Sequence, residues 1–245
     1  MNVDTVSRRA NAVLDEVERA IVGKREALEL VLLGMLADGH VLIEDFPGLA
    51  KTMIARAFAQ VTSIGFTRVQ FTPDLMPSDV TGASIYNQRE ADFEFRPGPI
   101  FTNLLLADEI NRAPAKVQSA LLEVMAEQHV TIAGHRHDVP VPFLVLATQN
   151  PIESEGVYPL PEAQRDRFLM KLVVGYPSAT EEFVVVERAL APAAVLQHII
   201  DPETLVGLQL QADQVYVDPS LIEFAVQLAH ATREPGRIGL TDLAR

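Results

Sequence analysis

The chain has 245 residues, 48% of them hydrophobic, and a formal net charge of −13. A chain of this length can bury a substantial core and exceeds the commonest domain size, which predicts one large domain and a smaller one. The acidic balance, with no Lys/Arg-rich run, argues against the basic stripe that binding to DNA or RNA requires, so we expect no nucleic-acid partner.

The chain contains no cysteine. Disulfides, thiolate zinc sites and cysteine nucleophiles are thereby excluded, and a reducing compartment fits. The N-terminal segment lacks the apolar core of a signal peptide, and the most apolar stretch, residues 30–43, is interrupted by Asp38 and His40. We therefore expect a cytoplasmic, non-exported protein without membrane insertion.

Two helices and a strand are predicted before residue 45. Apolar residues recur at steps of three and four in the first helix, namely Val6, Ala10, Val13, Val17 and Ile21. A second helix is expected over 25–37. An Asp-Gly pair then turns the chain into a short apolar strand over 40–44.

Strands and helices alternate from there to residue 174. The expected strands cover 66–71, 103–107, 143–147 and 169–174, and the expected helices cover 52–61 and 114–128. Two β-like runs lie within an irregular stretch, at 82–87 and 92–96, and a hairpin is expected around Ala133-Gly134. Strands that alternate with helices predict a parallel α/β sheet.

From Ser178 onward the pattern predicts helices only. Ser178 and Glu181 form a capping-box pattern, and Asp-Pro pairs at 201–202 and 218–219 favour helix starts. We place a domain boundary near Pro177, which gives an α/β domain over 1–177 and a helical domain over 178–245. The sequence stops in what reads as the start of another helix, so we expect the helical domain to be incomplete.

Residues 45–52, DFPGLAKT, suit phosphate binding between a strand and a helix. Backbone N–H groups of such a loop can surround phosphate oxygens, Lys51 can reach the β- and γ-phosphates, and the Thr52 hydroxyl can bind Mg²⁺. The match to the strict pattern is partial, because Asp45 and Ala50 stand where its two glycines belong. Taken alone, the segment could equally be a surface turn capped by an exposed lysine.

Two acidic residues, Asp108 and Glu109, end the apolar strand predicted over 103–107. At the carboxyl end of a strand, Asp108 can bind Mg²⁺ through water and Glu109 can polarise an attacking water. A later apolar strand ends near Asn150, which could orient that water and sense the γ-phosphate. Each feature alone also fits solvated acids or a turn. Together with the loop upstream, they predict a site for ATP and Mg²⁺.

The order Lys-Thr, Asp-Glu, Asn, followed by the segment RDRF at 165–168, resembles the AAA+ ATPases. The segments DEINRAP (108–114), ATQNP (147–151) and LPEAQRDRF (160–168) resemble the MoxR family in particular. The resemblance covers about residues 21–176. It implies a P-loop AAA+ fold, a three-layer α/β/α core with a parallel five-stranded sheet, followed by a small all-α lid.

The resemblance also implies roles for individual residues. In AAA+ proteins an arginine of the neighbouring subunit stabilises charge on the transferring phosphoryl group. Arg167 matches this finger, although Arg165, two positions away, leaves the assignment open. The implied nucleotide-binding residues are Val22, Gly23, Pro47, Gly48, Leu49, Ala50, Lys51, Thr52 and Met53; the catalytic residues are Glu109, Asn150 and Arg167; the metal-binding residues are Thr52 and Asp108.

As a function, the resemblance implies an ATPase that remodels or matures protein clients, assembles as a ring, expected to be a hexamer, and works with proteins carrying von Willebrand A domains. The family continues into a sensor arginine after a Gly-Ala-Ser-Pro segment, and no such segment precedes Arg245. Hydrolysis is therefore expected to suffer more than nucleotide binding. Two alternatives stay open: a nucleotide-gated assembly switch with little turnover, and a DNA-acting motor, which the acidic charge disfavours.

Overall fold

The computed structural model describes residues 3–44, 50–150, 158–192 and 194–233. The chain divides into two compact units, Met1–Ala212 and Asp213–Arg245. The first unit contains all the strands that the structure describes, and the second contains helix α9 (Pro219–Arg233). Within the described residues, no helix is long and apolar enough to cross a membrane.

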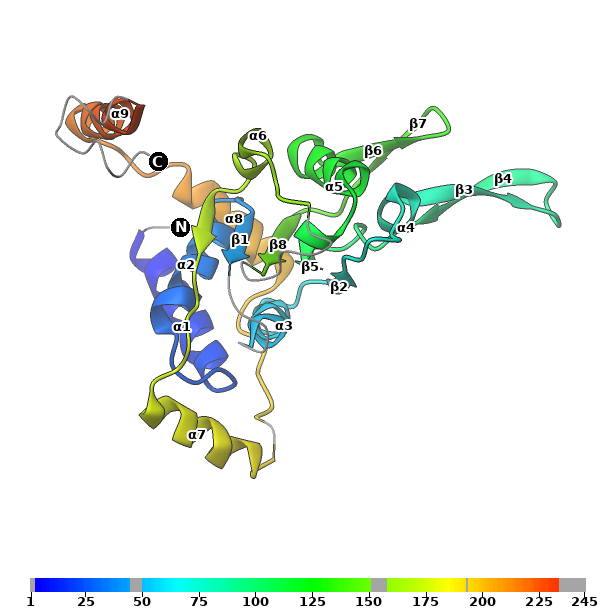
Figure 1. The fold of residues 1–245 in the computed structure, drawn as a ribbon. Helices are drawn as coiled ribbons and strands as arrows, with labels where there is room; N and C mark the ends of the chain where they lie inside the picture. The colour runs from blue at the N-terminus through cyan, green and yellow to red at the C-terminus, as the bar shows by residue number, and fades with distance from the viewer. Residues whose placement is uncertain (1–2, 45–49, 151–157, 193, 234–245) are drawn as a thin grey trace. The chain divides into compact units, whose positions relative to one another are not determined.

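A five-stranded parallel sheet forms the centre of the first unit, with strand order β2-β5-β8-β1-β9 (Figure 1). The strands are β1 (Val41–Glu44), β2 (Phe66–Gln70), β5 (Leu104–Asp108), β8 (Leu144–Gln149) and β9 (Met170–Leu172). The predicted α/β class and parallel five-stranded sheet are confirmed. β9 is shorter than the strand predicted over 169–174, and β8 reaches two residues past the predicted end at 147.

Two hydrophobic cores lie on opposite faces of this sheet. Alternate strand residues face opposite sides, so Leu104 and Leu106 enter one core while Leu105 and Ala107 enter the other. The first core is completed by α1 (Val3–Glu18), α2 (Arg25–Leu36), α3 (Lys51–Val61) and α8 (Pro202–Ala212), and the second mainly by α5 (Ala115–Glu127). The arrangement is the predicted three-layer α/β/α core.

Two hairpins and three short helical segments complete the connections between strands. The elements are α4 (Pro77–Thr81), β3 (Gly82–Asn87), β4 (Asp92–Pro97), η1 (Ile110–Arg112), β6 (His129–Ile132), β7 (His135–Asp138) and α6 (Glu162–Arg165). The predicted hairpin turn is confirmed, with positive φ at Ala133 and Gly134. The two hairpins meet where Phe95 stacks on His137, their ring centroids 3.8 Å apart.

Helices alone follow β9 in the described chain. α7 (Ala179–Ala189) begins with the predicted capping box, because the Glu181 N–H donates to Ser178 Oγ and the Ser178 N–H donates to Glu181 Oε2. α8 buries Leu205 and Leu208 in the core shared with α1 to α3. This packing places α8 in the first compact unit, whereas the predicted domain boundary near Pro177 stays a prediction.

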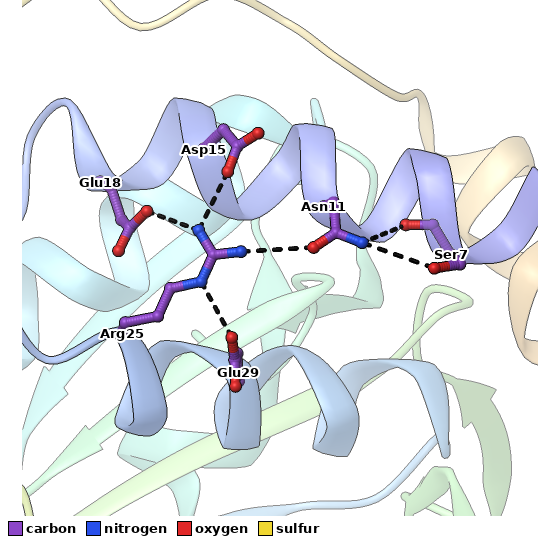
Figure 2. A network of polar contacts seen from close by, with 6 residues as sticks. All are labelled: Ser7, Asn11, Asp15, Glu18, Arg25 and Glu29. Atoms are coloured by element: carbon purple, nitrogen blue, oxygen red, sulfur yellow. Dashed lines mark hydrogen bonds and ion pairs between the residues drawn. The ribbon is translucent and has the colours of Figure 1, made fainter.

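A single arginine joins α1 to α2 (Figure 2). Arg25 Nη1 lies 2.9 Å from Asp15 Oδ1 and 2.5 Å from Glu18 Oε2, both on α1, and its Nε lies 2.9 Å from Glu29 Oε1 on α2. Arg25 Nη2 also donates to Asn11 Oδ1. We call these residues the Arg25 cluster. It fixes how the two helices cross on the outside of the first core.

Candidate active site

The predicted functional segments meet at one edge of the sheet. The strands are parallel, so their carboxyl ends share an edge, where ligands bind in open α/β sheets. β5 ends at Asp108, and Asn150 directly follows β8. Residues 45–50 connect β1 to Lys51, the first residue of α3. Because β8 lies between β5 and β1, three segments distant in sequence reach neighbouring positions.

The start of α3 holds the described part of the phosphate loop. Ala50 precedes the helix with φ 58°, the left-handed conformation that glycine adopts readily and alanine adopts at a cost of about 1 kcal/mol or more. This explains why the strict pattern has glycine at this position. Lys51 and Thr52 are half-buried and Met53 is exposed. The predicted binding residues Pro47, Gly48 and Leu49 lie outside the described residues.

Asp108 is held through both carboxylate oxygens. Its Oδ1 accepts a hydrogen bond from Thr148 Oγ1 on β8 at 2.6 Å. Its Oδ2 accepts two from Arg68 on β2, from Nε at 3.1 Å and from Nη2 at 2.6 Å. The Asp108 side chain is only 16% exposed, whereas that of Arg68 is 47% exposed. The aspartate is therefore largely buried and bonded on both oxygens, while its cationic partner borders solvent.

Glu109 occupies the turn that follows β5. Its φ of 57° is unusual for a non-glycine residue, and its backbone N–H donates to Thr148 Oγ1 at 2.8 Å. Its Oε2 accepts from Gln70 Nε2 at 2.8 Å and pairs with Arg112 Nε at 3.0 Å. Arg68 Nη2 donates to Gln70 Oε1, which orients the Gln70 amide so that its NH₂ group points to Glu109. One polar network thus holds both acids.

Asn150 lies at the carboxyl end of β8 and is 8% exposed. Its backbone carbonyl accepts a hydrogen bond from Asn111 Nδ2 at 3.3 Å, which ties it to the turn after Glu109. Asn111 is itself buried, and its Oδ1 has no hydrogen-bond partner in the described chain. The side chain of Asn111 on η1 thus links the predicted sensor residue to the turn that follows Glu109.

The predicted adenine segment, Val22 and Gly23, forms the turn between α1 and α2. Gly23 has φ 67° and Val22 is half-buried. A Cβ at position 23 would lie 2.0 Å from Glu181 Oε1, so the absence of a side chain lets the start of α7 approach. Lys24 Nζ donates to the Gly175 carbonyl at 3.0 Å. The turn is thereby joined to the segment that leads into α7.

The two candidate finger arginines differ in their contacts. Arg167 Nε donates to the Leu122 carbonyl at 3.0 Å and its Nη1 to the Ala163 carbonyl at 3.5 Å. Arg165 instead pairs with Glu162 at 3.7 Å on α6. Carbonyl bonds orient Arg167 without neutralising its charge, whereas Arg165 already has a carboxylate. These contacts favour Arg167 as the arginine available to an anion, although neither residue faces the carboxyl-edge network in any described contact.

Comparison with known proteins identifies the family. The model of the ATPase family associated with various cellular activities (AAA) matches residues 40–170, more than half of the chain. The chain is 51% identical over 228 residues to Chaperone MoxR1 of Mycobacterium tuberculosis, with 93% of this chain covered. It is also 51% identical over 223 residues to the uncharacterized protein YeaC of Bacillus subtilis, with 90% of this chain and 70% of YeaC covered. The chain belongs to the MoxR family of AAA+ ATPases.

A solved structure has the same fold. The crystal structure of a candidate ATPase from Cytophaga hutchinsonii superposes with a TM-score of 0.88 at 43% identity, covering 96% of this chain and 72% of the other. The chain spans 60% of the length of Chaperone MoxR1. The chain therefore has the AAA+ fold of its family. The activities of the longer MoxR proteins are proposals for this chain.

The donor groups at the MoxR site fit Mg²⁺ bound together with a nucleotide. Mg²⁺ prefers oxygen ligands and usually binds through one or two carboxylates plus phosphates and water. Asp108 supplies a carboxylate, and Thr52 supplies a hydroxyl at the start of α3. Among the described residues, no three His, Asp or Glu side chains gather into a metal site. Phosphate and water would therefore supply the remaining ligands.

Sequence reasoning missed four residues of this network: Arg68, Gln70, Arg112 and Thr148. A signal was present for the first two, which alternate on one face of the predicted strand over 66–71. Their partners followed only once β2 was placed beside β5, with Gln70 opposite Asp108. Strand order and register depend on the whole sheet, so the sequence alone did not reveal which polar side chains would meet.

Proposed function

We propose that this MoxR protein binds ATP with Mg²⁺ and hydrolyses the γ-phosphate bond. What carries the proposal is the fixed Asp108–Glu109 pair at the end of β5, on the same sheet edge as Asn150 and the start of α3. A phosphate-binding helix start and a strand-end acid pair are the parts that P-loop NTPases combine. Membership of an ATPase family supports the same reading.

The nucleotide would be bound by the loop before α3, the Val22–Gly23 turn and Asp108. Lys51 would contact the β- and γ-phosphates, and the N–H groups at the start of α3 would bind phosphate oxygens, because a helix N-terminus attracts anions. Pro47, Gly48, Leu49 and Ala50 would complete the loop. Val22 and Gly23 would pack against the adenine. Thr52 and Asp108 would hold Mg²⁺, which neutralises charge on the phosphates when bound.

Hydrolysis would depend on Glu109, Asn150 and Arg167. Glu109 would accept a proton from the attacking water, with its backbone fixed by the Thr148 hydrogen bond. Gln70 and Arg112 both hold Glu109 Oε2, which leaves Oε1 to accept the proton from that water. Asn150 would orient the water and sense the γ-phosphate. Arg167 of a neighbouring subunit would stabilise the transferring phosphoryl group, which requires a ring.

The cellular role follows from the family. We propose a ring, expected to be a hexamer, that remodels or matures protein clients together with proteins carrying von Willebrand A domains. One relative is named a chaperone, which supports the first part. The acidic charge supports a protein client rather than a nucleic acid. The alternative, a nucleotide-gated assembly switch with little turnover, and the cytoplasmic location stay predictions.

Phosphate release from ATP with Mg²⁺ tests the activity. We expect Glu109→Gln to lower turnover at least about 100-fold, because the amide cannot accept the proton, while ATP binding stays close to wild type. Lys51→Ala serves as the binding-deficient control. Wild-type chain that binds ATP without releasing phosphate would favour the switch, and an unchanged rate in Glu109→Gln would remove Glu109 from the mechanism.

Mixing two inactive variants tests the ring in the same assay. A ring with Glu109→Gln and Arg167→Ala subunits contains some interfaces where an intact Glu109 meets an intact Arg167. Turnover should therefore reappear on mixing and rise per subunit with protein concentration. Co-assembled variants that recover no activity would contradict the assignment of Arg167, and Arg165→Ala would then replace it in the mixture.

A further inference from the structure

Arg68 pairs directly with Asp108, the predicted metal ligand. Two of its N–H groups reach the same carboxylate oxygen, Asp108 Oδ2, at 3.1 and 2.6 Å. Nothing in the sequence analysis assigned a role to this residue. The proposed function needs this carboxylate for Mg²⁺, so the arginine and the metal would compete for it.

A charged partner stabilises the Asp108 carboxylate. Asp108 is 16% exposed, and a carboxylate largely removed from water is costly unless it is paired or hydrogen-bonded. Thr148 supplies one neutral hydrogen bond to Oδ1, which leaves Oδ2 to a charged partner. The Arg68 guanidinium is that partner in the structure.

The arginine can leave at little cost. Its side chain is 47% exposed and long, so the guanidinium can turn into solvent and be hydrated there. Exchange of the guanidinium for another cation therefore costs less than it would if both partners were buried, because only Asp108 is largely removed from water. A divalent cation that reaches Oδ2, directly or through water, would also repel a guanidinium left in place within a few ångströms.

We propose that Arg68 is the resident counter-ion of Asp108 in the metal-free protein and that Mg²⁺ has to displace it. The inference rests on the proposed function, because it assumes that Asp108 takes part in binding Mg²⁺ with a nucleotide. Arg68 would then be a positioning residue that sets the Mg²⁺ concentration at which nucleotide binds. It keeps Asp108 in place without a metal and raises the metal concentration needed to load the site.

The test measures binding rather than turnover. AMP-PNP, a nonhydrolysable ATP analogue, is titrated onto wild type, Arg68→Gln and Arg68→Lys at a series of free Mg²⁺ concentrations. We expect the Mg²⁺ midpoint to fall about tenfold in Arg68→Gln, because the competing charge is gone. Arg68→Lys keeps the charge and should stay near the wild-type midpoint. AMP-PNP affinity in EDTA should change little in either variant.

A matched control separates this effect from general neutralisation of the edge. Arg112→Gln removes an equal charge, but its partner is Glu109 rather than Asp108. Its midpoint should move much less than that of Arg68→Gln. An equal fall in both would overturn the inference, and so would a raised or unchanged midpoint in Arg68→Gln, since the arginine would then support metal binding or be indifferent to it.

The two proposals fail in different ways. Wild-type chain that binds no AMP-PNP at any Mg²⁺ concentration would overturn the proposed function and this inference together. Wild-type chain that binds AMP-PNP with a clear Mg²⁺ dependence, but without the shift in Arg68→Gln, would overturn the inference alone. Thermal unfolding of each variant confirms that the folded protein is being titrated.

Discussion

Arg25 and Arg68 both pair with carboxylates, but only the partner of Arg68 is proposed to bind a metal. Arg25 pairs with Asp15, Glu18 and Glu29 on the outside of α1 and α2 (Figure 2), and Arg68 pairs with Asp108 at the carboxyl edge of the sheet. Both side chains are partly exposed, at 36% and 47%. The difference lies in the carboxylates, because those around Arg25 serve only the fold, whereas Asp108 also has a proposed ligand.

The comparison separates permanent polar contacts from exchangeable ones. The three carboxylates, Asp15 first, raise the pKa of Arg25 above its ordinary value, so the arginine keeps its charge near neutral pH. Arg68 has one carboxylate and one amide partner, and a metal can replace it at the carboxylate. The number of ion pairs does not distinguish the two sites. The difference is that Asp108 has a proposed second ligand, Mg²⁺.

The largest effect on ATP turnover is expected when Asp108, the acid of the exchangeable pair, loses its charge. Asp108→Asn keeps the shape and can still bond to Thr148, but it removes the carboxylate proposed for Mg²⁺. We expect Mg²⁺-dependent ATP turnover to fall about 100-fold or more, with a small change in Tm. Asp15→Asn is the matched control in the Arg25 cluster and should leave turnover unchanged. Similar losses in both variants would break the comparison.

Much of the fold, and the position of the predicted site segments in it, was predictable from the sequence, and the reasons are local. The apolar runs before Asp108 and Asn150 are buried strands because no other arrangement hides them, and the motif at 45–52 follows a strand as its spacing requires. The alternation of strands and helices predicted the parallel sheet, and the family resemblance added the three-layer core; the structure confirms both. The roles of the site residues remain predictions that the geometry accommodates.

What the sequence did not reveal depends on register and on distant packing. Thr148 reads as a plain strand residue, yet its hydroxyl joins the Asp108 carboxylate to the Glu109 backbone. α8 reads as part of a separate helical domain, yet Leu205 and Leu208 complete the core of the α/β unit. Both contacts join segments far apart in the chain, and no local pattern specifies them.

An effect of intermediate size is expected at His40. Its hydrogen bonds have no competing ligand, but its ring can gain a proton. Its Nδ1 accepts from the Val145 N–H at 3.1 Å, so its Nε2–H donates to the Met125 carbonyl at 3.2 Å. Burial lowers the pKa of His40 below its ordinary value of 6.5, although the Met125 bond opposes the shift. Protonating Nδ1 would turn its acceptor into a donor facing another donor.

The sign of the pH effect follows from linkage. Below pH 6.5 the unfolded chain gains a proton at position 40 that the folded chain does not, so stability is full above that pH and falls as the pH drops. The slope due to His40 is at most about 1.4 kcal/mol per pH unit. Urea unfolding between pH 7.5 and 5.5 measures it. His40→Gln should lose this component, and an identical pH slope in both proteins would contradict the assignment.

The smallest effect is expected at the permanent cluster itself. Arg25→Met keeps the apolar stem and removes the charge that joins Asp15, Glu18 and Glu29. Exposed pairs are weak and screened by salt, so we expect a modest fall in Tm that high ionic strength reduces, because salt weakens the wild-type pairs as well. ATP turnover and the Mg²⁺ midpoint should stay at wild-type values. A midpoint shifted as far as that of Arg68→Gln would mean that the cluster communicates with the site through the Val22–Gly23 turn, and the division between permanent and exchangeable arginines would fail at its permanent member.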